Sequence, residues 1–278
     1  MSRTFVIAEA AATHDGNYAK ALRLVDLAAQ IGCDAVKMQW ISSAERLCER
    51  RRAPEYLDAY RLLQFPEAWF PDLLARCEEH GIELMTTCYL PEDIHVIARY
   101  VKRFKISSFE ATDAHFVALH AEWPEKPLII SAGMGASLRR SLERYTDAFL
   151  GRAVPRWQAL HCVSAYPCPT DQIGLAAIRR HPIYQWGDKR HGLSDHTRHP
   201  WTGALAVAAG AEVIEFHCRL DDTDPRNADY EVARTPEESR VYVENIRVAE
   251  AMIGDGVTRV QEAEREMTRY RVGTEEAK

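Results

Sequence analysis

The stretch from Thr4 to Gln39 decides the fold: it reads TFVIAEA at 4–10, LRLVDLAAQIG at 22–32 and AVKMQ at 35–39. The two outer pieces are short and apolar, as expected of strands that are buried on both faces. The middle piece carries apolar residues at helical spacing. Gly32 follows it, at the position of a helix C-cap. This pattern predicts two parallel strands joined by a helix.

The same alternation continues along the chain, and Gly81 and Gly210 stand where two further helices should end. We expect strands at Thr4–Ala10, Ala35–Gln39, Glu83–Thr87, Arg103–Ile106, Pro127–Ser131, Gln158–Cys162, Gly187–Leu193 and Glu212–His217. Residues 235–253 are predicted as the last helix. Eight such units in 278 residues predict an α/β protein with one domain over residues 1–278, a closed (β/α)₈ TIM barrel.

One connection is unusually long for such a barrel. Residues 40–65 follow the second strand, and we interpret them as a lid or as a loop that contacts a partner. The segment includes the densest basic cluster, Arg50, Arg51 and Arg52, flanked by Glu49 and Glu55. Because charges of both signs are mixed there, we interpret the cluster as a solvated face rather than a polyanion site.

Composition excludes several classes of protein. The net charge of −6 argues against a nucleic-acid surface. No window approaches 18 uninterrupted apolar residues, so no membrane span is expected. Seven cysteines lie mostly in apolar runs without CxxC spacing. This pattern predicts buried, reduced thiols in a cytoplasmic protein.

Polar and ionisable side chains gather at the carboxyl ends of the predicted strands, where active sites of such barrels lie. The set is Glu9, Lys37, Gln39, Thr86, Thr87, Lys105, Ser107, Ser108, Glu110, Ser131, His161, Ser164, Tyr166, Ser194, Asp195, His196, Thr197, Glu215 and His217. Lys37 and Lys105 beside a core predict an anion site, or else pairing with a carboxylate such as Glu9 or Glu110. The residues alone leave these alternatives open.

Two histidines end adjacent strands. His196 and His217 could converge on one divalent metal through their imidazole nitrogens. The alternative is that each is a hydrogen-bonded polar residue without a metal.

Seven ordered motifs resemble the sialic acid synthase family over about residues 4–270. They are IAE with HDG at 7–16, AVKMQ at 35–39, FKISSFE at 104–110, ISAGM at 130–134, LHCVSAYP at 160–167, GLSDHT at 192–197 and VIEFH at 213–217, followed by Asp229. The resemblance implies an enzyme that condenses phosphoenolpyruvate with an N-acylated hexose, or a related sugar aldehyde, to a nonulosonic acid. It also implies a divalent cofactor, Mn²⁺ or Mg²⁺, and a homo-oligomer.

The resemblance assigns roles residue by residue. His196 and His217 would bind the metal. The phosphoenolpyruvate site would be Lys37, Lys105, Ser107, Ser108, Ser131 and Ser194, and the sugar site Glu9, Thr87, Ser164, Tyr166 and Asp229. Glu110 would be the acid/base group, in a catalytic set with Glu9 and Lys105.

The chemistry implied by the resemblance suits these residue types. The metal would polarise the aldehyde, C3 of phosphoenolpyruvate would attack it, and water would capture the positive charge at C2. Phosphate would then leave with C–O cleavage. Glu110 would deprotonate the water, and the lysines would offset the negative charge.

Departures from the family pattern lie at the sugar end. Family members usually carry a C-terminal antifreeze-like domain whose arginine reaches a partner's sugar site, and we expect this chain to be the barrel domain alone. Ser164 and Thr13 stand where the family commonly has asparagine, and RNAD at 226–229 replaces Pro-Gly-Pro-Asp. The reaction type is therefore better predicted than the acceptor.

Other functions stay open at this point. One is a related synthase that acts on a different aldose or a nucleoside-linked sugar. A ketodeoxyoctonate-type or heptulosonate-type synthase would need a further basic pocket for a phosphorylated aldose. A metal-dependent hydrolase or isomerase is disfavoured, because a His-x-His pair is absent from the first strand. The non-catalytic alternative is a sugar-binding barrel.

Overall fold

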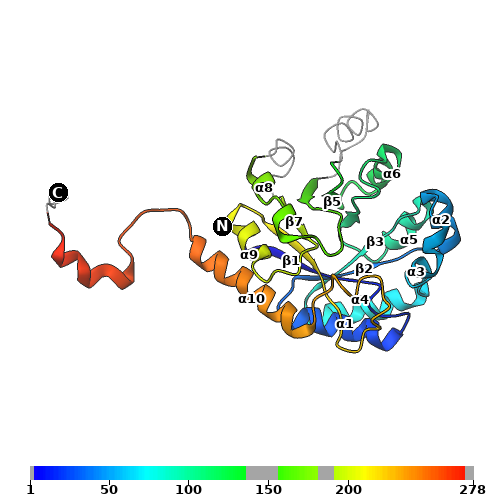
Figure 1. Ribbon diagram of the computed structural model, residues 1–278, viewed down its shortest axis with the longest axis horizontal. Coiled ribbons are helices and arrows are strands. Elements are labelled where there is room, and N and C mark those ends of the chain that lie inside the picture. The colour runs from blue at the N-terminus through cyan, green and yellow to red at the C-terminus, as the bar shows by residue number, and fades with distance from the viewer. Residues whose placement is uncertain (1–2, 136–155, 181–190, 273–278) are drawn as a thin grey trace.

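The protein is a closed barrel of eight parallel strands in sequence order, which confirms the predicted (β/α)₈ fold (Figure 1). The structure, a computed structural model, describes residues 3–135, 156–180 and 191–272. The strands are β1 (Phe5–Ala11), β2 (Ala35–Gln39), β3 (Glu83–Thr87), β4 (Phe104–Ile106), β5 (Leu128–Ala132), β6 (Trp157–His161), β7 (Gly192–Asp195) and β8 (Val213–His217).

Helices surround the barrel on its outside (Figure 1). They are α1 (Tyr18–Gln30), α2 (Ala44–Arg51), α3 (Leu57–Arg61), α4 (Phe70–His80), α5 (Ile94–Ile97), α6 (Ala114–Leu119), α8 (Ala176–Arg180), α9 (Thr202–Ala208) and α10 (Pro236–Ile253). Gly81 is the left-handed C-cap of α4, and Gly32 and Gly210 have positive φ just after α1 and α9. The predicted glycine stops are therefore confirmed.

The seventh strand differs from its prediction. Residues 187–190 of the predicted strand lie outside the described residues, and β7 extends to Asp195. A Cβ atom on Gly192 would lie 1.8 Å from the carbonyl oxygen of Val213. The absence of a side chain there lets β7 and β8 approach closely, and it sets the position of Ser194 and Asp195.

The barrel interior has an apolar layer below a polar one. Alternate side chains of a strand point to the same face. The apolar layer contains Ile7, Ala35, Met85, Ile129, Leu160 and Val213. Two residues further along these strands come Glu9, Lys37, Thr87, Ser131 and Glu215, which line a cavity. Strand periodicity thus places the polar set at the carboxyl end of the barrel.

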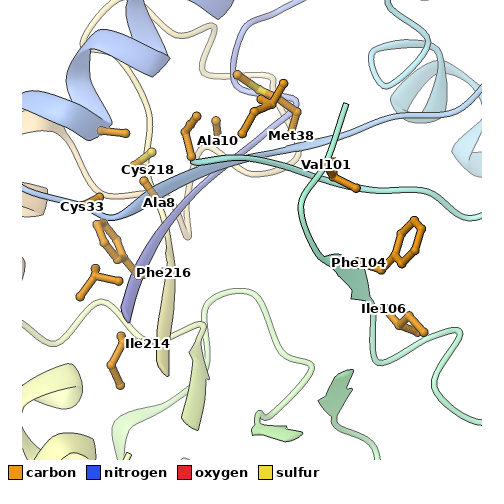
Figure 2. Close-up of a cluster of buried hydrophobic side chains, with 14 of the residues drawn as sticks. Ala8, Ala10, Cys33, Met38, Val101, Phe104, Ile106, Ile214, Phe216 and Cys218 are labelled. Carbon is orange, nitrogen blue, oxygen red and sulfur yellow. The ribbon is translucent and has the colours of Figure 1, made fainter. Parts of the chain in front are cut away.

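The intervening strand residues face the helices and form the main core. Val6, Ala8, Ile130, Ile214 and Phe216 belong to this buried outer layer. Figure 2 shows part of the layer, including Ala8, Ile214 and Phe216. Strands buried on both faces explain why their sequences are almost wholly apolar at the amino end.

The segment 40–65 is packed and partly helical. It contains α2 and α3, and its apolar residues form a separate cluster with the β3 end of the barrel. The cluster comprises Ala12, Ile41, Ala44, Leu47, Leu63, Tyr89 and Leu90. We refer to residues 40–65 as the β2–α4 cap. Its own core fixes it against the carboxyl end of the barrel.

Two composition-based predictions can be compared with the described residues. All seven cysteines are free and buried, as predicted. Among the described helices, none is long and apolar enough to cross a membrane.

Candidate active site

Most of the predicted strand-end residues meet at one cavity inside the carboxyl end of the barrel, whereas Thr86, His161, Asp195 and Thr197 do not line it. Its lining consists of Glu9, Lys37, Gln39, Thr87, Tyr89, Lys105, Ser107, Ser108, Ser131, Tyr166, Ser194, His196, Glu215 and His217. Three predicted site residues stand behind the lining: Glu110 contacts Ser107, Ser164 contacts Ser108, and Asp229 faces His217. The cavity thus gathers side chains from strands that are far apart in the sequence.

Both cavity lysines are almost fully buried, and both are paired. Lys37 forms an ion pair with Glu9 and donates a hydrogen bond to Thr87 Oγ1 at 3.0 Å. Lys105 Nζ donates to Ser131 Oγ at 2.8 Å and lies 3.4 Å from Glu215 Oε1. The structure therefore gives each lysine a carboxylate partner, Glu9 for Lys37 and Glu215, rather than Glu110, for Lys105.

Glu215 is the acidic centre of this group. Burial opposes its ionisation, but the positive charges of Lys105 and Lys37 outweigh that and lower the pKa of Glu215 to about 2. Burial lowers the pKa of Lys37 to about 7, with Glu215 acting in the opposite direction. Ser194 Oγ donates to Glu215 Oε1 at 2.9 Å. This carboxylate is thus held as an anion by Lys37, Lys105 and Ser194, which come from β2, β4 and β7.

A group of small side chains lies on the opposite wall. The hydroxyls of Ser108 and Ser164 are 2.9 Å apart, and Ser107 donates to Glu110 Oε2. A Cβ on Gly133 would lie 2.3 Å from Ser164 Oγ. The glycine after Ser131 and Ala132 is therefore required by close packing against these serines.

The two histidines have their rings 5.4 Å apart, between centroids. His196 Nδ1 lies 2.6 Å from the carbonyl oxygen of Val163, so Nδ1 carries the hydrogen and Nε2 keeps its lone pair. Burial, with His217 nearby, lowers the pKa of His196 to about 3. A neutral imidazole with a free lone pair is the form that binds metals.

His217 has a buried polar atom without a hydrogen bond. Its Nδ1 lies 3.3 Å from Asp229 Oδ1, beyond good hydrogen-bond geometry. Burial would raise the pKa of Asp229, but His217 outweighs this and holds it below its usual value. Within the described residues, no three His, Cys, Asp or Glu side chains are grouped as a complete metal site. The two imidazoles fit a divalent cation whose remaining ligands come from water or substrate.

Tyr166 lies over the histidines at the cavity rim. Its ring is 4.2 Å from that of His196 and 5.8 Å from that of His217, and 43% of the residue is exposed. An exposed ring beside two imidazoles offers an apolar face and a hydroxyl to a molecule entering the cavity.

A family model described as the NeuB family matches residues 24–258, most of the chain. The chain belongs to the NeuB family. It is 30% identical to a pseudaminic acid synthase of Campylobacter jejuni, over 91% of this chain and 76% of that one. It is 32% identical to an N,N'-diacetyllegionaminic acid synthase of Legionella pneumophila, over 91% and 74%.

A solved structure is also similar to this NeuB-family chain. The N-acetylneuraminic acid synthetase of Leptospira borgpetersenii, in complex with citrate, superposes with a TM-score of 0.83 at 27% identity. The match covers 97% of this chain and 92% of that one. The family resemblance read from the motifs is thus confirmed.

Four residues of this NeuB-family site had no predicted role, or had a different one. Gln39 and Glu215 stand at strand ends and were given no role. Side chains two residues apart in a strand share a face, so Gln39 lies on the cavity wall with Lys37, and Glu215 lies there with His217. Tyr89 also lines the cavity, and its position two residues after Thr87 could have predicted this. The solvated interpretation is wrong for Arg51, whose guanidinium contacts Glu110 at 2.6 Å.

Proposed function

We propose that this NeuB-family chain condenses phosphoenolpyruvate with a sugar aldehyde to a 2-keto-3-deoxy acid of the nonulosonic type, with release of phosphate. It would thus be a transferase that forms a C–C bond, with residues 1–278 as one synthase domain. The observation that carries the proposal is the convergence of Lys37 and Lys105 with His196 and His217 on one cavity. Relatives that are named as synthases of pseudaminic acid and N,N'-diacetyllegionaminic acid support a product of this class.

The lysine side of the cavity is the proposed phosphoenolpyruvate site. Lys37, Lys105, Ser131 and Ser194, with Ser107 and Ser108, present ammonium and hydroxyl groups. These groups match the anionic oxygens of a phosphate and a carboxylate. When the substrate binds, its oxygens would replace Glu9 as the partner of Lys37. Glu9 would then be available to the sugar hydroxyls.

The charge balance of the cavity supports a divalent cofactor. In the described part of the lining, the charges of Lys37 and Lys105 are already offset by the carboxylates Glu9 and Glu215. An anionic substrate therefore meets no net positive charge from these four groups. We propose Mn²⁺ or Mg²⁺ at His196 and His217. When bound, it would supply Lewis-acid polarisation of the sugar aldehyde.

The remaining roles fall to the chain's own side chains. C3 of phosphoenolpyruvate attacks the aldehyde carbon, and the positive charge at C2 is captured by a water molecule. Glu110, beside Ser107, accepts one proton of that water, which balances the proton that the aldehyde oxygen takes up as the C–C bond forms. The C–O bond to the phosphate then breaks, C2 becomes the ketone, and phosphate leaves with its bridging oxygen and the second proton of the water. Lys105 compensates the negative charge throughout.

The acceptor is proposed to resemble an N-acylhexosamine, because one relative is named for a diacetylated product. Tyr166, Thr87, Ser164 and Asp229, with Glu9, are the proposed contacts. We further propose a cytoplasmic homo-oligomer, and the seven buried free thiols support a reducing compartment.

Phosphate release tests the proposal. Purified protein is given phosphoenolpyruvate and a panel of N-acylated and plain aldoses, with and without Mn²⁺. We expect phosphate release that requires both the cation and one class of sugar. Sugar binding without phosphate release across the panel would instead support a sugar-binding barrel.

A further inference from the structure

Arg51 reaches the active site from outside the barrel. It lies in the last turn of α2, and Ser43 Oγ caps the first turn by accepting from Arg46 N. Ala44 and Leu47 bury the underside of α2 in the apolar cluster of the β2–α4 cap. Because the helix is held by its own core, the Arg51 side chain is directed toward the barrel rather than free on the surface.

The guanidinium of Arg51 is held by a carboxylate and by aromatic rings. Its Nη2 donates to Glu110 Oε1 at 2.6 Å, and Nε lies 3.3 Å from the same oxygen. The guanidinium carbon is 4.7 Å from the ring centroid of Tyr89 and 4.9 Å from that of Phe109. Planar guanidinium groups stack on such rings, so this position is specific for arginine.

The other oxygen of Glu110 points toward the cavity. Oε2 accepts the hydrogen of Ser107, and Ser107 lines the cavity wall. The carboxylate is therefore oriented from two sides, by Arg51 at the back and by Ser107 at the front. The path from Arg51 to the cavity passes through these two side chains.

The Arg51–Glu110 ion pair is largely withdrawn from solvent. The Glu110 side chain is 3% exposed and that of Arg51 is 19% exposed. An ion pair this far from solvent is screened little, so each partner restrains the position of the other. Burial opposes the charge of Arg51, but Glu110 outweighs this and raises the pKa of Arg51 above its usual value. Arg51 is thus a permanent countercharge.

We propose that Arg51 is a positioning residue of the condensation, which pairs with the Glu110 carboxylate and keeps it aimed at Ser107. The inference rests on the proposed function, because it gives Glu110 the acid/base role. Arg51 itself touches neither substrate. The β2–α4 cap therefore contributes a side chain that positions an active-site carboxylate.

Arg51→Met tests the proposal, since it keeps the apolar stem and removes the charge. We expect kcat at neutral pH to fall at least about tenfold, which is less than the roughly 10²–10⁴-fold contribution of an acid/base group because Glu110 itself remains. The acidic limb of the kcat/KM profile should move upward by about one pH unit or more. The KM for phosphoenolpyruvate should stay nearly unchanged. Arg51→Lys, which keeps the charge without the planar fork, should restore part of the profile.

Arg50→Met is the matched control. Arg50 precedes Arg51 in α2 and pairs at 2.7 Å with Asp113 rather than with the Glu110 carboxylate. Its pH profile should equal that of the unmodified protein. Superimposable profiles for Arg51→Met and Arg50→Met would overturn the proposal. A rise in acceptor KM alone would also overturn it, because Arg51 would then contact the sugar.

Two further measurements separate this proposal from the proposed function. If Glu110→Gln keeps full activity, the acid/base role of Glu110 fails, whatever Arg51 does. Infrared spectra at neutral pH need no turnover: Arg51→Met should show a protonated carboxyl band that the Arg51→Met/Glu110→Gln protein lacks. The countercharge role would be refuted if this band were missing from Arg51→Met at neutral pH and also from Arg51→Lys at lower pH.

Discussion

Tyr242 donates its phenolic hydrogen to Asp195 Oδ2 over 2.6 Å, and neither side chain has exposed surface. Arg234 adds a second bond to the same oxygen at 2.9 Å, and its guanidinium lies 4.0 Å from the Tyr242 ring. Asp195 stands between Ser194 and His196 in the chain. Helix α10 is thereby tied to the strand end that carries the site, and it is followed by a 3-10 helix at Glu262–Tyr270 rather than being the last helix, as was predicted.

Replacing Tyr242 with Phe should lower the free energy of unfolding by roughly 1–3 kcal/mol, because a buried hydrogen bond to a charged group is lost. Tyr18→Phe is the control. Tyr18 donates to Asp72 over the same 2.6 Å, but at the surface. Tyr18→Phe should change the free energy of unfolding by no more than about 0.5 kcal/mol. Urea unfolding of both variants measures this, and equal losses would contradict the argument from burial.

Replacing His196 or His217 with Ala should abolish metal-dependent turnover and leave the fold intact. Loss of outer-shell partners alone costs about 10–100-fold in metal affinity, so loss of a ligand should cost at least about 100-fold. Mn²⁺ titration measures the affinity, and circular dichroism checks the fold. His199→Ala, outside the cavity lining, is the control. Unchanged affinity in both ligand variants would remove the metal assignment.

Lys105→Met should weaken phosphoenolpyruvate binding by roughly 1.5–3 kcal/mol, the scale of charged hydrogen bonds. The structure also pairs Lys105 with Glu215, so binding and thermal stability must both be measured. The exposed Lys102→Met is the control. A Lys105→Met protein that melts earlier but binds normally would assign Lys105 a structural role.

Phosphoenolpyruvate binding should weaken as the pH rises above 7. The pKa of Lys37 in the free protein is lowered to about 7, so the lysine loses its proton above that pH, while an anionic ligand favours the charged form. Binding should then take up a proton, with a loss of affinity of up to about tenfold per pH unit. Calorimetry in buffers of different ionisation enthalpy detects this uptake. Lys37→Met should abolish it, and an affinity that is flat from pH 7 to 9 would contradict it.

The acceptor should differ from N-acetylmannosamine. Ser164 stands where the family commonly has asparagine, and its hydroxyl is already hydrogen-bonded to Ser108, so it offers N-acetylmannosamine a shorter and partly occupied polar contact. A site built to hydrogen-bond a group of its substrate rejects sugars that lack this group by orders of magnitude in kcat/KM. We expect another N-acylhexosamine to have the higher kcat/KM. Steady-state kinetics across the sugar panel decide this, and N-acetylmannosamine as the best substrate would refute it.

Most of the site could be predicted because the strands alternate strictly. Ala35 in the apolar layer fixes Lys37 in the polar layer above, and Ile129 does the same for Ser131. The same rule extends to Gln39 and Glu215, which were noted at strand ends without a role. Glu110 and Asp229 were predicted from the family motifs, since no strand periodicity covers them.

The amino-acid sequence by itself determined the eight strands, the glycines that end the helices, and the set of polar side chains at one end of the barrel. Local patterns specify these features, because they record which face of each element is buried. The partners within that set were decided only in three dimensions. Glu215 pairs with Lys105 across the barrel, and Arg51 reaches Glu110 from 59 residues away in the sequence. Such contacts depend on how separate elements pack and on how far a long side chain extends, and neither is encoded in any single stretch of the chain.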